Sequence, residues 1–172
     1  IDNFFAENKQ SGTFKVQLGY GKTYVIMLWA DCTNDNYTVT WDDKDINACK
    51  VAIADTGALV SQDDSADAFF AKVEVLVSDA APAPINMTRP FAQINVCTDD
   101  YADAVTRGFT ATQTSMKVNA YTSLNLFSGE VGDKQDITFA LKPIPTGDDA
   151  KMPIEGKEWK RIAMNYVFAP EA

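Results

Sequence analysis

Short runs of alternating apolar and polar residues, each bounded by a cluster of turn-forming residues, recur along almost the whole chain. The clearest is Met87–Val96, in which the Arg89-Pro90 pair marks a turn and the following residues alternate in polarity. A period of two places successive side chains on opposite faces of an extended backbone. The pattern therefore indicates half-buried strands of a β-sandwich.

The same pattern predicts the other strands and two short helical pieces. Asp, Asn, Gly and Pro clusters separate the runs, as expected for turns. A helical turn is expected at 67–71, and a short helix at 99–106 follows an N-cap-like Thr-Asp-Asp sequence. Strands are predicted at 13–18, 24–30, 37–41, 50–53, 72–77, 87–96, 109–121, 135–141 and 159–168. The fold class is all-β: two packed antiparallel sheets with one or two short helices.

Length, composition and charge limit the domain organisation and the partners. A chain of 172 residues with 46% hydrophobic content can bury one sizeable core, so we expect a single domain over 13–172 after an N-terminal arm at 1–12. The formal net charge of -9 gives no attraction for a phosphate backbone or an anionic membrane surface. Nucleic acid is therefore not an expected partner, and no apolar run reaches the length of a membrane span.

Residues that carry chemistry are few. Histidine is absent, and nothing distinguishes any pair of the 24 acidic residues as a catalytic pair, so we predict no enzyme, no catalytic residues and no cofactor. The sequence 19–23, GYGKT, ends like a phosphate-binding loop but lacks the earlier glycine and leads into a strand. Acidic clusters at 31–35, 42–45, 63–67 and 99–103 favour solvated turns over a metal site; for calcium, 31–36 is the first place to look.

Cysteine and tryptophan leave alternatives open. Cys32, Cys49 and Cys97 are odd in number and show no C-x-x-C spacing, which favours free thiols, although a Cys32–Cys49 bridge is possible in an oxidising compartment. Tryptophans occur at 29, 41 and 159, each in a predicted strand. Core packing is the commoner fate of such rings, and an exposed sugar-stacking platform is the alternative.

Five segments together resemble fimbrillin-like proteins, the superfamily of pilus subunits of Bacteroides-type Gram-negative bacteria. They span 24–170 and correspond to the N-terminal domain of such subunits. The segments are 24–31 (YVIMLWAD), 67–70 (DAFF), 87–96 with its RPFAQ core, 121–131 (YTSLNLFSGEV) and 162–170 (IAMNYVFAP).

The resemblance implies a transthyretin-like sandwich, export as a lipoprotein, outer-membrane attachment by a lipid anchor in the precursor, and display on the cell surface. It implies assembly into a fimbria, with other fimbrial subunits as partners, by exchange of a β-strand. It also implies a second β-domain after this one, which this chain does not include. Members that polymerise are commonly cleaved after an N-terminal arginine, whereas the first arginine here is Arg89.

For this function the expected site is a pair of strands. Chain-terminal strands can be exchanged without breaking the interior, which selects the first and last strands as donating or receiving edges. Asp64-Ser65-Ala66 resembles the O-glycosylation acceptor pattern of these bacteria, with Ser65 as the acceptor. The alternative function is a glycan-binding module, with a host or bacterial surface glycan or protein as partner. The candidate edge residues are Thr13, Phe14, Val16, Leu18, Trp159, Ile162, Met164 and Tyr166.

Overall fold

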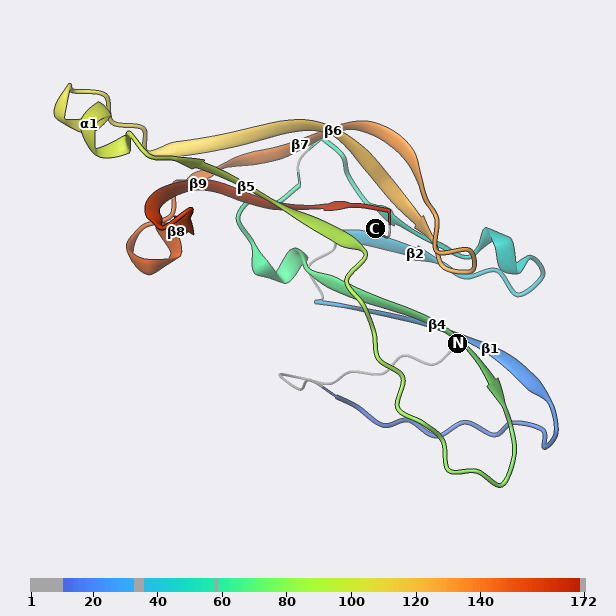
Figure 1. The fold of residues 1–172 in the computed structure, drawn as a ribbon. Coiled ribbons are helices and arrows are strands. Elements are labelled where there is room, and N and C mark those ends of the chain that lie inside the picture. The colour runs from blue at the N-terminus through green and yellow to red at the C-terminus, as the bar shows by residue number, and fades with distance from the viewer. Residues whose placement is uncertain (1–10, 33–35, 58, 171–172) are drawn as a thin grey trace.

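The computed structural model describes residues 11–32, 36–57 and 59–170. Nine strands, one α-helix and three short 3-10 turns make up the chain over these ranges (Figure 1). The strands are β1 (Thr23–Asp31), β2 (Tyr37–Thr40), β3 (Lys50–Ile53), β4 (Ala68–Leu76), β5 (Phe91–Thr98), β6 (Gln113–Asn125), β7 (Val131–Pro143), β8 (Lys151–Ile154) and β9 (Lys157–Phe168). The helical pieces are η1 (Ile46–Ala48), η2 (Asp64–Ala66), α1 (Tyr101–Thr106) and η3 (Gly147–Ala150).

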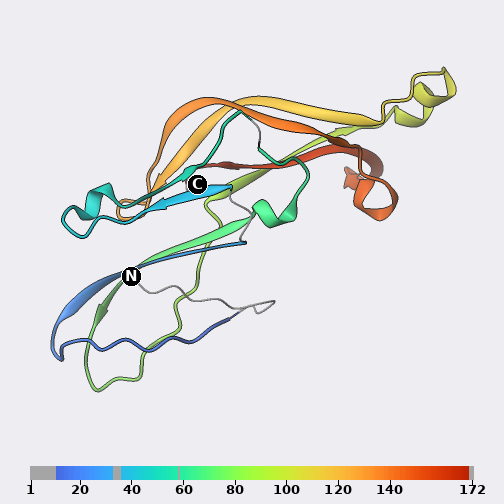
Figure 2. The same ribbon diagram turned by 180° about the vertical axis from the view of Figure 1, so that it is seen from behind.

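The strands form two antiparallel sheets of very different size. The large sheet has the order β2-β3-β6-β9-β5, with β7 also paired to β6 and β8 to β9. The small sheet contains only β1 and β4. Figures 1 and 2 show the small sheet facing one end of the large sheet, while α1 and the β8–β9 hairpin extend beyond it at the other end. The prediction of an all-β, two-sheet sandwich is therefore confirmed.

Strand β9 carries the core because both of its faces are buried. Residues Ala163–Phe168 are all buried. Met164, Tyr166 and Phe168 belong to the main apolar cluster between the two sheets, whereas Val167 belongs to a second cluster with Leu59, Ile137 and Phe139. Because neighbouring side chains of a strand point to opposite faces, the second cluster lies on the other face of the large sheet.

The connection between β3 and β4 covers this second cluster. Leu59 donates its backbone N–H to Thr138 O at 3.0 Å and accepts from the N–H of Ala140 at 2.8 Å, which attaches the connection to β7. The backbone N–H of Gln62 donates to Met164 O at 3.0 Å. The connection is thereby attached to β9 as well.

Several local predictions need correction. The helical turn expected at 67–71 occurs earlier, as η2, because the side chain of Asp63 caps it by accepting from the N–H of Ser65 at 2.8 Å. Residues 68–71 already belong to β4. Strand β8 was not predicted, whereas the helix expected at 99–106 is confirmed as α1.

Candidate functional site

Strand β1 is a sheet edge that no other described strand covers along its whole length. It pairs with β4 from Thr23 opposite Leu76 to Asp31 opposite Ala68, nine residues in continuous register. Among the residues that the structure describes, no strand pairs with its other side. An open edge presents a row of backbone N–H and C=O groups on which another strand can form.

The hydrogen bonds of β4 show which backbone groups of β1 point outward. Phe70 donates to Thr88 O and accepts from the Thr88 N–H, both at 2.8 Å, on the side of β4 away from β1. Phe70 therefore forms a non-hydrogen-bonded pair with Trp29, and the backbone groups of Trp29 point away from β4. Because this alternates along an antiparallel ladder, the outward-facing residues are Thr23, Val25, Met27, Trp29 and Asp31.

The sequence of β1 lacks the features that usually protect an edge. Its first eight residues, TYVIMLWA, contain no charge and no proline. The edges of the large sheet are protected: β5 has a register shift between Val96 and Cys97, β2 and β8 have four residues each, and β7 carries several charges. The outer edge of β4 carries Lys72 and Glu74 and is occupied at Phe70 by Thr88. The edge of β1 is therefore long and mainly apolar.

Packing of Trp29 fixes β1 against the large sheet. Its ring centroid lies 5.6 Å from that of Tyr37 and 6.2 Å from that of Phe91, both in edge-to-face contact. Its indole N–H donates to Asp31 Oδ2 at 2.7 Å. These contacts hold the open edge in one position, so a pairing strand would meet a preformed partner.

The segment before β1 does not form the predicted strand. Residues 11–18 have no regular secondary structure, so the strand predicted at 13–18 is wrong, and β1 pairs with β4 instead. Phe14 and Val16 are 44% and 48% exposed, Thr13 is exposed and Leu18 is half-buried. Both views show this segment on the side of the small sheet that faces away from the large one (Figures 1 and 2).

The turn between this segment and β1 accounts for the path of residues 11–18. Gly21 has a φ of 70°, a conformation that glycine adopts without strain, and its N–H donates to Val77 O at 2.9 Å. That bond attaches the turn to the end of β4, while the chain before it leaves in another direction. The segment thus keeps a strand-like sequence without a place in either sheet.

The last strand is not an edge, so its prediction as an exchanged or receiving edge is wrong. β9 pairs with β5 on one side and contacts β6 and β8 on the other. Trp159 and Ile162 lie in its first half, and Met164 and Tyr166 lie in its buried half. Withdrawing β9 would expose both apolar clusters, which excludes it as a donor.

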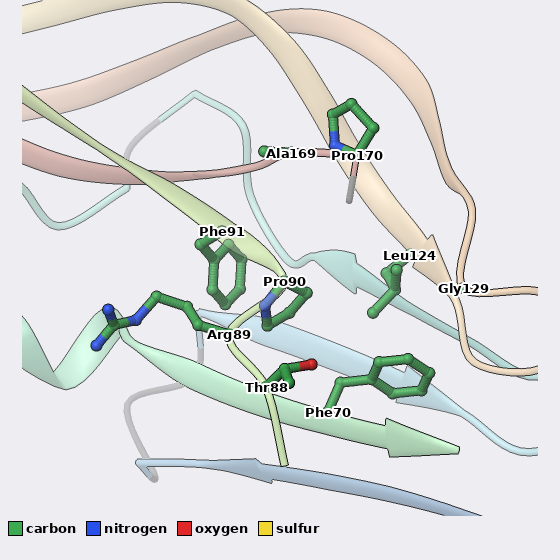
Figure 3. Close-up of a pocket in the computed structure, with 9 residues that line it drawn as sticks. All are labelled: Phe70, Thr88, Arg89, Pro90, Phe91, Leu124, Gly129, Ala169 and Pro170. Carbon is green, nitrogen blue, oxygen red and sulfur yellow. The ribbon is translucent and has the colours of Figure 1, made fainter. Parts of the chain in front are cut away.

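A cavity of about 380 Å³ opens between the two sheets beside β4 (Figure 3). Phe70 borders it from the small sheet, and Phe91 and Leu124 border it from the large sheet. Within the part of the chain that the structure describes, the outer edge of β4 pairs only at Phe70, through Thr88. The remaining lining residues are Thr88, Arg89, Pro90, Gly129, Ala169 and Pro170.

At the rim of this cavity, an ion pair connects the residue before β4 with the segment that leads into β5. Arg89 Nε donates to Asp67 Oδ1 at 2.7 Å and Nη2 donates to Asp67 Oδ2 at 2.5 Å, a bidentate pair. This contact raises the pKa of the Arg89 guanidinium above its usual value. Tyr166 lies beside the pair, where burial raises the pKa of its phenol, and it accepts from Gln93 Nε2 at 2.9 Å. These contacts of Arg89, Asp67 and Tyr166 are of the kind that stabilises a fold.

Because of Tyr37, the free energy of unfolding is expected to depend on pH in the alkaline range. Burial first, and the negative charges of Asp31 and Asp67 next, raise the pKa of its phenol above the ordinary value of 10.0, and its hydroxyl donates to Ala66 O. Above pH 10 the unfolded chain loses this proton while the folded chain keeps it, so the unfolding free energy falls, by up to about 1.4 kcal/mol per pH unit. We expect Tyr37→Phe to reduce the slope of the unfolding free energy against pH by the contribution of one proton. Urea denaturation between pH 9 and 11 measures this slope. An unchanged slope would contradict the assignment.

The other predicted sites are placed as follows. Ser65 lies in η2 and is half-buried, with the exposed Asp64 before it. The three cysteines, all within the described ranges, are free thiols, so the Cys32–Cys49 bridge is not formed. Over the described residues, no group of three or more Cys, Asp or Glu side chains could hold a metal; the calcium candidate 31–36 includes 33–35, which lie outside those residues.

Comparison with known proteins places the chain in one family. A protein family of unknown function, DUF6562, matches residues 2–172, and the chain belongs to it. No curated protein and no solved structure matches the chain. Among the described helices, none has the length and apolar character required to cross a bilayer.

Proposed function

We propose that this member of the DUF6562 family is a structural or adhesive subunit, or an accessory component, of a bacterial surface fimbria, and that subunits join by strand pairing at β1. The single observation that supports this most strongly is the open edge of β1, nine residues long and without protecting features. Its cellular place would be the outer surface, with a lipid anchor in the precursor. The resemblance of five segments to fimbrillin-like proteins supports the same function.

Strand addition would satisfy the groups that β1 leaves outward. Up to five residues can each offer an N–H and a C=O to an incoming strand, and each hydrogen bond contributes about 0.5–1.5 kcal/mol. With a donor segment other than β1 itself, acceptor and donor are different surfaces of the chain, so the contact is head-to-tail. Such a contact continues into a filament unless the rotation closes a ring.

Residues 11–18 are the donor that the chain itself offers. Phe14, Val16 and Leu18 alternate with polar residues, which is the pattern of a half-buried strand. Sequence pattern and local structure disagree here, and such disagreements are expected at functional sites. Pairing with β1 of a neighbouring subunit would resolve the disagreement, with the turn at Gly21 as the hinge.

Association of the full chain tests this function. We expect concentration-dependent oligomers in sedimentation-velocity experiments and linear particles by negative-stain electron microscopy. A synthetic peptide of residues 11–18 should cap β1 and shorten these particles, whereas a peptide with the same composition in scrambled order should not.

Two results would count against the proposal. A chain that stays monomeric at every concentration in the absence of the peptide would exclude assembly by this chain alone. Oligomers that are indifferent to the peptide would show that residues 11–18 are not the donor, and would leave β1 to be tested directly by substitution.

A further inference from the structure

A second cavity, of about 310 Å³, lies at the end of the large sheet that the small sheet does not cover. It is open to solvent on one side and bordered by the end of β5 with α1, by η3, and by the β8–β9 hairpin, which Figure 1 shows extending away from β1 and β4. The volume is in the range of small-molecule sites. The lining residues are Thr98, Asp99, Tyr101, Ala102, Gly147, Ala150, Lys151, Glu158, Trp159 and Lys160.

Trp159 differs from the other two tryptophans in what it packs against. Trp29 and Trp41 both pack against the main core cluster, so neither is an exposed platform. Trp159 belongs to neither apolar cluster and is only half-buried. The indole of Trp159 thus borders a cavity and does not belong to the described core. Contact with a ligand is a role that this position allows.

The second ring of the cavity, that of Tyr101, is held in place by its own contacts. Its hydroxyl donates to Ala111 O at 2.8 Å. Lys160 Nζ lies 5.4 Å from the centroid of its ring and also donates to Pro145 O. The ring of Tyr101 is therefore held in place before any ligand arrives, which reduces the entropic cost of binding.

The charges around the cavity indicate a neutral, hydroxyl-rich ligand. Two carboxylates, Asp99 and Glu158, balance two ammonium groups, those of Lys151 and Lys160. Lys151 is engaged with Asp148 at 3.1 Å and Lys160 with Pro145, whereas within the described ranges neither carboxylate has a hydrogen-bond partner. Both carboxylates are exposed and can accept hydrogen bonds from a ligand.

We propose that this cavity binds a neutral pyranose of a glycan, with the sugar ring against Trp159 and its hydroxyl groups on Asp99 and Glu158. The less polar C–H face of a pyranose matches an indole ring, and its hydroxyls match carboxylate acceptors. Because the cavity is distant from β1, sugar binding and strand pairing can occur on the same molecule. The inference does not depend on the assembly function.

The test uses the full chain and defined sugars. The probes are the methyl glycosides of glucose, galactose, mannose and N-acetylglucosamine, and oligosaccharides of each, followed by saturation-transfer NMR and tryptophan fluorescence. We expect saturable binding of at least one probe. Trp159→Ala should weaken it at least about tenfold, and Glu158→Gln about tenfold through the loss of one charged acceptor.

Phe109→Ala is the matched control, because Phe109 follows α1 at the same end, is 65% exposed and does not line the cavity. It should bind sugar like the parent chain. Trp159→Phe keeps an aromatic ring and serves if the alanine variant fails to fold; it should bind more weakly than the parent. Absence of saturable binding to every probe, or equal binding by the parent and by the Trp159 and Glu158 variants, overturns the inference.

Discussion

Proline at position 25 is expected to stop strand pairing at β1 while the domain remains folded. The N–H of Val25 points outward, so its loss removes no bond to β4, and proline is found on edge strands with the N–H side toward solvent. An incoming strand would lose that donor and meet the ring. We expect Val25→Pro to weaken association more than about tenfold by sedimentation, with an unchanged circular dichroism spectrum.

Two further variants make this result specific. Val25→Thr keeps the N–H and the branched shape and should associate like the parent chain. Ile26→Pro removes a group that points toward β4 and should destabilise the fold itself. If Val25→Pro assembles as well as the parent, the outer edge of β1 is not the contact.

The second large effect is on stability, at the centre of the sandwich. Phe168 is 1% exposed, and its ring centroid lies 4.6 Å from that of Phe91 and 6.0 Å from that of Tyr37. Alanine at this position leaves a cavity that neighbouring strands cannot fill, so we expect Phe168→Ala to lower the free energy of unfolding by about 3–5 kcal/mol. Guanidinium denaturation measures this loss, which is a large part of the stability of an ordinary domain.

The same replacement at an exposed phenylalanine gives the comparison. Phe109→Ala removes the same atoms from a side chain that is 65% exposed, and its effect should stay within about 0.5 kcal/mol. Equal effects of the two substitutions would mean that Phe168 does not anchor the core.

Alternation along the sequence identified most of the strands, although not β8, and did not identify their neighbours. β5, β6, β7 and β9 were predicted because each repeats with a period of two over many residues. The partner of β1 is β4, about 45 residues later in the chain by the two strand midpoints, and no local pattern encodes that pairing. Residues 13–18 have the right pattern and form no strand, because the turn at Gly21 is bonded to the end of β4 and the segment before it lies on the outer side of the small sheet, not along the edge of β1.

The candidate sites show the same limit. The run from Ala163 to Phe168 is buried on both faces, and such near-continuous apolar character is a sequence signal of an interior strand that could have excluded β9 as an edge. The outward direction of β1 required the bond between Phe70 and Thr88. Tyr101 and Trp159 are distant in sequence, and only the fold brings them to one cavity.

The central place of β9 has a consequence during synthesis. The ribosome completes this strand after all the others of the domain, yet β5 and β6 are joined through it. Until Phe168 has emerged, the nascent chain carries two apolar strands whose shared neighbour does not yet exist. Folding of the large sheet therefore waits until β9 has left the ribosome, and contacts between distant residues make it slow. A chaperone that shields β5 and β6 in that interval should raise the yield of folded protein.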